Sequence, residues 1–257
     1  NHITLAHALS PVEIDQIPNL TPSDWLAPYA QSRILRHNSP METLMADRSQ
    51  TLGEEIANAV SHGIGFLLAI ASLPILVHHA ALRGTAFDVV GASVFATTMI
   101  LLYLVSAIYH AIPASRAKVW LNRLDHAAIY VFIAGSYTPF TLGVLRGGWG
   151  WTLFGVVWAC AALGVGIKLL NRLRHPLVST GLYLAMGWVA VVAIGPLMAR
   201  MPPQGLAWLV AGGVAYTLGA AVFLLDNRLR YAHFVWHLLV LGGSMCHFFA
   251  ALWYAYA

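Results

Sequence analysis

Long apolar stretches separated by short polar connections make up almost all of the chain after residue 55. A helix needs about 20 mostly apolar residues to cross the hydrocarbon core of a bilayer. Seven stretches meet this length, at residues 57–81, 88–112, 124–145, 149–170, 177–198, 205–225 and 233–256. We therefore predict an all-α integral membrane protein, a bundle of seven transmembrane helices that occupies residues 55–257.

The composition agrees with this prediction and excludes several other classes of protein. Hydrophobic residues make up 59% of the 257 positions and charged residues 9%, whereas soluble domains carry about 25% charged residues. Lysine and arginine occur one to three at a time between apolar stretches, so the chain lacks the basic face that binds nucleic acids. Cys160 and Cys246 lie inside apolar runs and form no CxxC pair, which indicates neither a disulfide scaffold nor a thiolate zinc site.

The basic residues of the connections are distributed unequally between the two sides of the membrane. Connections on the cytoplasmic side of a membrane protein carry more lysine and arginine. One side here holds eleven of these residues and the other holds three. The larger group is Arg33, Arg36, Arg48, Arg116, Lys118, Arg123, Lys168, Arg172, Arg174, Arg228 and Arg230, and the smaller is Arg83, Arg146 and Arg200. We predict a multi-pass protein of the cell membrane with a cytoplasmic N-terminus and an external C-terminus.

Residues 1–54 differ in character from the rest and are predicted to be a cytoplasmic segment, partly flexible or interfacial. Prolines at positions 11, 18, 22, 28 and 40 prevent a long helix. Residues 23–36 could form a short amphipathic helix with Ser23 as its N-cap. Two alternatives stay open for this stretch: a helix on the cytoplasmic membrane surface, or a flexible tail.

Several ionisable residues fall within or beside the predicted spans, where each costs roughly 2.5–3.5 kcal/mol at the helix centre. The predicted orientation puts seven of them at one depth, in the cytoplasmic halves of four different spans. These residues are Glu55, His62, His110, Asp125, His126, His233 and His237. His247 lies deeper, about 15 Å beyond His237 at a rise of 1.5 Å per residue.

The histidine spacing of the last span predicts a metal site. His233 and His237 are four residues apart, so they lie on one helix face with Cβ atoms about 5–6 Å apart, and both imidazoles can reach one zinc ion. His110 on the second span would complete a set of three histidines with one open position, the arrangement of a catalytic zinc. Phe234 stands where the HExxH helix of metalloproteases has its glutamate. A base must therefore come from another helix, and Asp125 is the best candidate.

Structural alternatives stay open for most of these residues. A buried histidine can simply hydrogen-bond two helices together, and this interpretation is preferred for His126 and His247. Glu55 could complement the positive N-terminal end of its helix. Asp125 could form an ion pair with a basic residue of a connection.

Four blocks of residues resemble the hemolysin III proteins of bacteria, within the progestin and adipoQ receptor family. The resemblance covers roughly residues 52–256, and the order of the blocks on seven predicted spans makes it specific. The blocks are Glu55, Asn58, Ser61, His62, Gly63 and Gly65; Ser106 and His110; Asp125, His126, Ile129 and Tyr130 with residues 135–139; and His233 and His237 with His247 and Phe248.

The resemblance implies a seven-helix bundle with an internal N-terminus and a zinc ion near the cytoplasmic leaflet. The zinc histidines of the family match His110, His233 and His237. The aspartate that holds the zinc-bound water in the family matches Asp125, and the serine of the second-helix motif matches Ser106. Two features depart from the pattern of the bacterial branch: phenylalanine rather than glutamate directly after the first histidine of the last motif, and the long N-terminal segment.

Three functions follow from the site and the resemblance. The receptor branch of the family resembles lipid amide hydrolases of the ceramidase type, and bacterial members are associated with cytolysis and with membrane lipid homeostasis. The first hypothesis is a zinc hydrolase that cleaves an amide or ester bond of a membrane lipid, with Asp125 and Ser106 in the reaction and membrane lipids as the partners. The second is a non-enzymatic membrane receptor or sensor in which zinc holds helices together. A pore-forming cytolysin comes third, because the basic connections and seven apolar spans are typical of a resident membrane protein.

Overall fold

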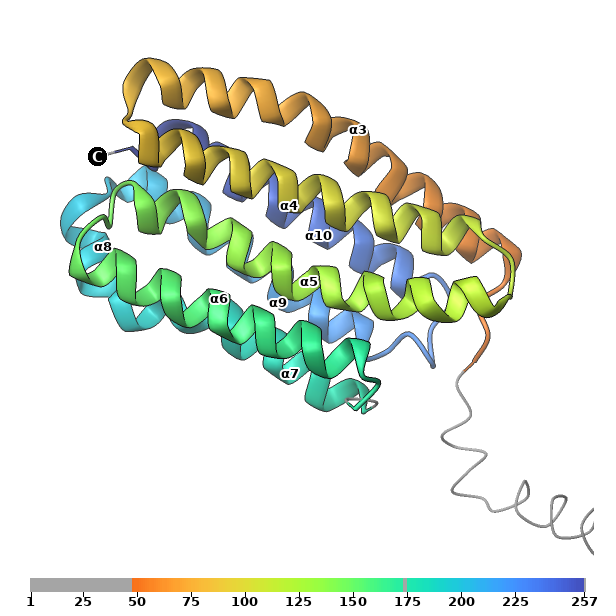
Figure 1. The fold of residues 1–257 in the computed structure, drawn as a ribbon. Helices are drawn as coiled ribbons and strands as arrows, with labels where there is room; N and C mark the ends of the chain where they lie inside the picture. Colours follow the sequence, from red (N-terminus) through yellow and green to blue (C-terminus); the bar gives the residue numbers. More distant parts are fainter. Residues whose placement is uncertain (1–47, 173–174, 257) are drawn as a thin grey trace, which may run out of the picture. The chain divides into compact units, whose positions relative to one another are not determined.

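A computed structural model describes residues 48–172 and 175–256, and within these ranges the chain is almost entirely helical (Figure 1). No β-strand occurs in the described ranges. Residues 23–36, for which a surface helix and a flexible tail were the two alternatives, fall outside them. The elements are α3 (Leu52–Arg83), α4 (Ala86–Ala111), α5 (Arg116–Leu142), α6 (Gly148–Leu169), α7 (Pro176–Gly187), the 3₁₀ segment η2 (Trp188–Ala193), α8 (Ile194–Arg200), α9 (Pro203–Phe223) and α10 (Ala232–Tyr254).

The helices run back and forth along one direction, and successive helices are neighbours (Figure 1). α3 packs against α4, α4 against α5, and α5 against α6. α10 packs against both α9 and α3, and α5 also contacts α7 and α10. This topology brings the starts of α3, α5 and α10 and the end of α4 to the same end of the bundle.

Six of the predicted spans are long and apolar enough to cross a membrane. They are α3, α4, α6, residues Pro176–Arg200 taken together, α9 and α10. An all-α, multi-pass membrane protein is therefore confirmed. The count of seven spans and the cytoplasmic N-terminus stay predictions.

The remaining predicted span, the third along the chain, corresponds to α5, which is a helix of 27 residues but is less apolar than the others. The serine and threonine side chains of its C-terminal half are buried within the bundle. The hydroxyls of Ser136, Thr138 and Thr141 donate hydrogen bonds to carbonyl oxygens of α5 itself, over distances of 2.8–3.1 Å. An internal helix can carry these residues because its own backbone satisfies them.

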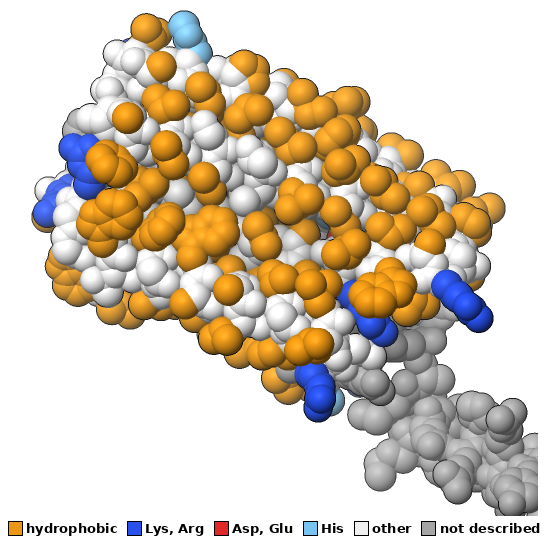
Figure 2. Space-filling view, viewed as in Figure 1, with side chains coloured by type: hydrophobic (Ala, Val, Ile, Leu, Met, Phe, Trp, Pro, Cys, Tyr) orange, Lys and Arg blue, Asp and Glu red, His pale blue; other side chains and the backbone are white. Residues whose placement is uncertain are grey.

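The surface of the bundle is apolar over most of its length (Figure 2). Large side chains such as Leu67 and Val192 remain 65% and 70% exposed. On the face shown in Figure 2, lysine and arginine lie near the two ends of the bundle with an apolar band between them. This distribution suits helices whose sides face lipid.

The stretch predicted as one span at residues 177–198 is broken into α7, η2 and α8. Pro196 lacks the N–H that would continue the α-helical ladder, and the turn before it tightens to 3₁₀. The Tyr137 hydroxyl donates to the carbonyl of Gly187 at 2.5 Å and accepts from the N–H of Ala190 at 3.0 Å. A side chain of α5 thus satisfies backbone groups at the break.

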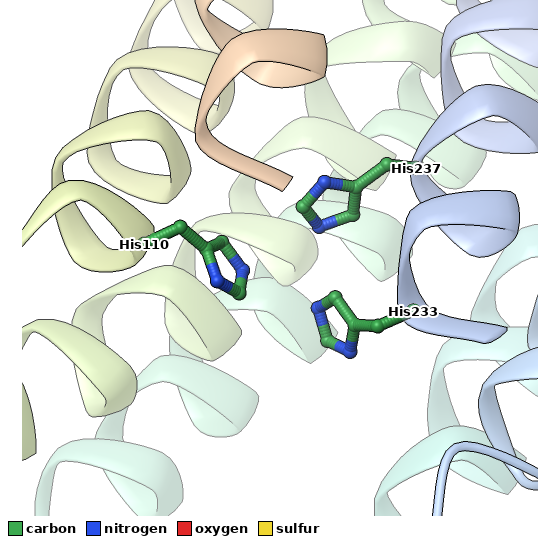
Figure 3. A group of neighbouring side chains, drawn as sticks. All are labelled: His110, His233 and His237. Atoms are coloured by element: carbon green, nitrogen blue, oxygen red, sulfur yellow. The ribbon is translucent and has the colours of Figure 1, made fainter. Parts of the chain in front are cut away.

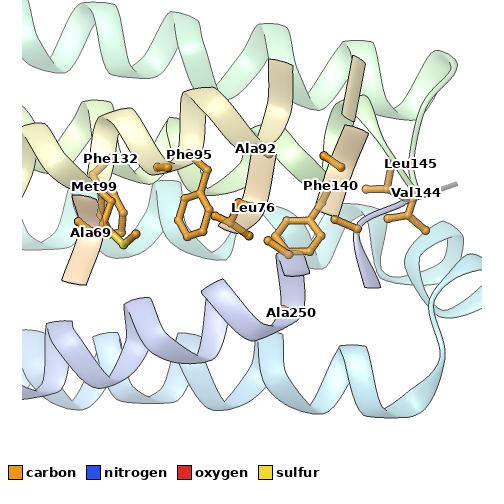
Figure 4. Close-up of a cluster of buried hydrophobic side chains, with 14 of the residues drawn as sticks. Ala69, Leu76, Ala92, Phe95, Met99, Phe132, Phe140, Val144, Leu145 and Ala250 are labelled. Atoms are coloured by element: carbon orange, nitrogen blue, oxygen red, sulfur yellow. The ribbon is translucent and has the colours of Figure 1, made fainter. Parts of the chain in front are cut away.

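The centre of the bundle is filled by the apolar core, a cluster that includes Leu76, Phe95, Met99, Phe132 and Ala250 (Figure 4). Small residues let the helices approach closely there. A Cβ atom added at Gly135 of α5 would clash with the Thr98 side chain on α4. α4 and α5 are therefore held in one register.

Candidate metal centre

Three imidazoles from two helices converge at the end of the bundle where α4 ends and α10 begins (Figure 3). His110 lies one residue before the end of α4, and His233 and His237 occupy the first two turns of α10. Each offers a ring nitrogen, and these atoms all lie within 4.8 Å of one another. The three residues brought together are the three predicted from the sequence, and they could hold a metal ion.

Each of these imidazoles is held at its Nδ1 atom by a different oxygen. His110 Nδ1 lies 2.7 Å from Glu55 Oε2, and His233 Nδ1 lies 3.0 Å from Asp226 Oδ2. His237 Nδ1 lies 3.3 Å from the backbone carbonyl of Asn58 and 3.2 Å from Ser61 Oγ, whose own hydrogen is donated to that carbonyl. Carbonyl and carboxylate oxygens accept hydrogen bonds, so Nδ1 carries the proton in each ring. The Nε2 lone pairs are then left to bind an ion.

The donor set fits a divalent metal such as zinc. His110 Nε2 is buried and has no hydrogen-bond partner among the described residues, as expected for an atom reserved for an ion. Neutral imidazoles that donate their second N–H to a carboxylate or carbonyl are the usual protein ligands of zinc. Three nitrogens leave one position of a tetrahedral site open to a further ligand.

Glu55 holds the site together across three helices. Its Oε1 atom accepts a hydrogen bond of 2.7 Å from Lys118 Nζ on α5, while its Oε2 atom meets His110 on α4. Glu55 therefore does more than complement the positive N-terminal end of α3, because its carboxylate also contacts the candidate metal ligand His110.

A cavity of about 120 Å³ opens beside the histidines. Ser106, Asp125, His62, His233 and His237 all line it. We call this group together with His110 the histidine end of the molecule. The Ser106 hydroxyl is buried and has no hydrogen-bond partner among the described residues, and it faces the space next to the candidate ligands.

Asp125 is also available to a bound molecule. Among the described residues it forms no ion pair. The nearby guanidinium of Arg123 lies over the Trp120 ring, 4.8 Å from its centroid. The structural alternative of an ion pair is thus not observed, and the carboxylate lies at the cavity beside two candidate metal ligands.

Beyond the histidines the cavity is mainly apolar and deep. Its wall includes Phe132, Leu184, Trp188 and Val240, and it extends to His247. His233 and His247 are separated by fourteen residues of α10, which corresponds to about 21 Å at 1.5 Å per residue. The cavity therefore reaches from the histidine end well into the predicted membrane interior.

The two histidines expected to bridge helices differ. His247 Nε2 contacts the carbonyl of Leu209 on α9 at 3.3 Å, which is a contact between helices. His126 Nδ1 instead contacts the carbonyl of Asn122 on its own helix at 2.8 Å. The helix-bridging interpretation therefore holds for His247 and is wrong for the His126 side chain.

Two of the oxygens that contact the candidate ligand histidines are not marked by any pattern in the sequence. Asp226 lies in the connection before α10, seven residues from the histidine it holds, and no periodic pattern marks it. The Asn58 contribution is a backbone carbonyl, which any residue supplies. Only Glu55 carried a signal, as an acid placed on the same helix face as Asn58 and His62.

The chain is similar to known proteins over most of its length. A family model described as haemolysin-III related matches residues 50–248. The chain is 44% identical over 214 residues to "Hemolysin-3" of Bacillus cereus, covering 83% of this chain and 97% of the relative. It is 44% identical over 204 residues to the "Hemolysin-3 homolog" of Bacillus subtilis, covering 79% and 95%. The "Monocyte to macrophage differentiation factor" of Homo sapiens is 26% identical over 233 residues, covering 87% and 92%.

Proposed function

The chain belongs to the haemolysin-III related family, and we propose that it is a zinc-dependent hydrolase of membrane lipids, cleaving an amide or ester bond in the manner of a ceramidase. It is a multi-pass protein of the plasma membrane. The observation that carries the proposal is a cluster of three imidazoles, two of which share one cavity with the Asp125 carboxylate and the Ser106 hydroxyl. Among the described residues the Ser106 hydroxyl has no hydrogen-bond partner. Its role would be in membrane lipid homeostasis.

The residues of the histidine end have separate parts in this proposal. His110, His233 and His237 bind the ion, which when bound supplies a water of pKa about 7 as nucleophile. Asp125 accepts a proton from the attacking water at a carboxylate oxygen and passes it to the leaving nitrogen or oxygen. The Ser106 hydroxyl donates a hydrogen bond to the water or to the substrate carbonyl.

The shape of the cavity supports a lipid substrate. Beyond the histidine end the wall of the cavity is mainly apolar, which suits the carbonyl linkage of a membrane lipid together with part of its acyl chain. Transfer of an acyl chain from the bilayer into an apolar cavity changes its free energy little, because both environments are apolar. The carbonyl at the base of the chain would then lie beside the histidines.

A paired comparison of two buried aspartates tests the proposal. Purified protein in lipid nanodiscs is incubated with ceramides and with ester lipids of matched chain length, and released fatty acid is measured. Zinc-dependent release by the wild type should fall by about 10²–10⁴-fold in Asp125→Asn, the range for loss of a general base. Asp88→Asn is the control, because Asp88 is also buried but caps α4 by accepting from the N–H of Thr85. Equal release by wild type and Asp125→Asn contradicts the proposal.

A receptor or sensor with a structural zinc is the second candidate, and the ion-pair network favours it. Glu55 links α3 to α4 through His110 and to α5 through Lys118, so an ion at the histidines would fasten four helices. This function expects wild-type protein that binds zinc and loses thermal stability on its removal, while no lipid is cleaved. A cytolysin, which the relatives' names suggest, would instead make liposomes leak even after the histidines are replaced.

A further inference from the structure

His62 is a buried histidine of α3 whose ring has no hydrogen-bond partner in the part of the chain that the structure describes. The residue is 3% exposed, and both Nδ1 and Nε2 are buried and without a partner among the described residues. A buried donor or acceptor without a partner is costly, so such groups are normally paired with protein, water or a ligand. His62 lines the same cavity as Ser106 and Asp125, and a molecule in that cavity can supply the missing partner.

The ring of His62 is stacked on a candidate metal ligand. The centroids of His62 and His237 are 3.4 Å apart and their planes differ by 9°. An imidazole binds a metal in the plane of its own ring, so an ion held by His237 would lie in the plane of His237. His62 lies in a parallel plane one ring thickness away and cannot ligate that ion at the about 2.0–2.1 Å that zinc requires. His62 therefore stands outside the candidate ligand set, although it lines the same cavity.

We propose that His62 donates a hydrogen bond to the carbonyl oxygen of the substrate as that oxygen becomes negative during the reaction. This inference rests on the proposed hydrolase function and adds a residue to it. A neutral imidazole has one N–H in either tautomer, so the donor is present without a change of charge. Stacking on His237, together with the edge contact to Tyr103 at 5.0 Å between centroids, fixes the ring before a ligand arrives, and preorganised donors of this kind stabilise developing negative charge effectively.

The chemical step is balanced without any further reactant. The water oxygen forms a bond to the carbonyl carbon, and the π electron pair moves onto the carbonyl oxygen that His62 faces. When that pair re-forms the C=O bond, the C–N or C–O bond breaks, and the leaving nitrogen or oxygen takes the proton that Asp125 removed from the water. The products are a carboxylic acid and an amine or alcohol. The hydrogen bond from His62 is strongest when the substrate oxygen carries the negative charge.

Two variants and two probes that are not turned over test this assignment. His62→Phe keeps a flat ring but has no N–H, whereas His62→Gln keeps a donor. The probes are a long-chain alkyl(methyl)phosphinic acid, which has the tetrahedral anionic shape, and the matching methyl ketone, which has the planar carbonyl. With bound zinc measured for every sample, His62→Phe should weaken phosphinate binding about 10²-fold or more, the scale of one lost donor. Ketone binding should weaken by less than about 10-fold, and His62→Gln should restore most of the phosphinate affinity.

The outcomes separate this inference from the function on which it rests. Wild type that holds zinc and binds the phosphinate, with His62→Phe binding it equally well, overturns the role of His62 alone. Loss of affinity that is the same for both probes, or the same in His62→Gln as in His62→Phe, shows a packing role and also overturns it. Wild type that holds zinc but binds neither probe overturns the hydrolase function itself.

Discussion

The apolar core and the histidine end both bury polar side chains, but these groups are hydrogen-bonded differently in the two regions. In the core, Ser72, Thr98 and Ser244 donate to carbonyl oxygens of their own helices over 2.7–2.9 Å. At the histidine end, Ser106 and both nitrogens of His62 have no such partner among the described residues. A hydroxyl that donates to a carbonyl of its own helix needs no further partner and can be packed among apolar side chains. A buried polar group that faces a cavity unpaired implies a molecule or ion that pairs with it.

If the two regions are independent, one substitution can remove the bound zinc and another can destabilise the apolar core. We expect the largest effect for loss of the zinc. His237→Ala should reduce bound zinc from about one ion per chain to almost none, because only two imidazoles remain and a stable site usually has at least three protein ligands. Metal content of the purified protein by mass spectrometry measures this. His78→Ala, which removes an exposed histidine of α3, is the control and should keep its zinc. A full complement of zinc in His237→Ala would show that the three histidines are not the site.

The next effect concerns the core alone. Phe95 is fully buried and packs near Phe132, with ring centroids 6.1 Å apart. Phe95→Ala should lower the free energy of unfolding by about 3–5 kcal/mol through the cavity that it leaves, while zinc content stays that of the wild type. Denaturant titration in detergent and metal analysis of the same samples measure both.

Val90→Ala is the matched control for the core, since Val90 lies on the same helix with its side chain half exposed. Its unfolding free energy should stay within about 0.5 kcal/mol of the wild type. If Phe95→Ala loses zinc while it remains folded, the two regions are coupled and the distinction between them fails.

The sequence predicts the parts of this molecule that depend on local patterns. Apolar length located every helical stretch of the bundle but not the division of residues 177–198 into α7, η2 and α8. The four-residue spacing of His233 and His237 placed two candidate ligands on one face. Which helices are neighbours depends on packing that periodicity does not encode, so the stack of His62 on His237 could not be foreseen. The break at η2 and the Tyr137 contacts that satisfy it were missed for the same reason.

A third prediction concerns Glu55, the residue that joins helix packing to the candidate metal centre. Glu55→Gln should weaken zinc affinity about 10–100-fold, the usual cost of losing an outer carboxylate that orients a ligand histidine. Titration against a competing chelator measures the affinity. Glu54→Gln is the neighbouring control, because Glu54 accepts from Thr51 and from the N–H of Tyr231 rather than from a candidate ligand. Equal zinc affinity in Glu55→Gln and wild type would contradict the orienting role.

We expect the smallest effects from substitution of two buried serines, one in the apolar core and one at the histidine end. Ser72→Ala removes a hydroxyl that its own helix satisfies, so it should change the unfolding free energy by no more than about 1 kcal/mol and leave zinc content and lipid cleavage as they are. Ser106→Ala removes a buried hydroxyl that has no partner within residues 48–172 and 175–256, so unfolding stability should stay equal or rise slightly, while zinc-dependent cleavage falls. Thermal unfolding, metal analysis and fatty-acid release on the same preparations measure all three quantities. A Ser106→Ala protein that is clearly destabilised but cleaves lipid normally would reverse the assignment, because its hydroxyl would then support packing and not a bound molecule.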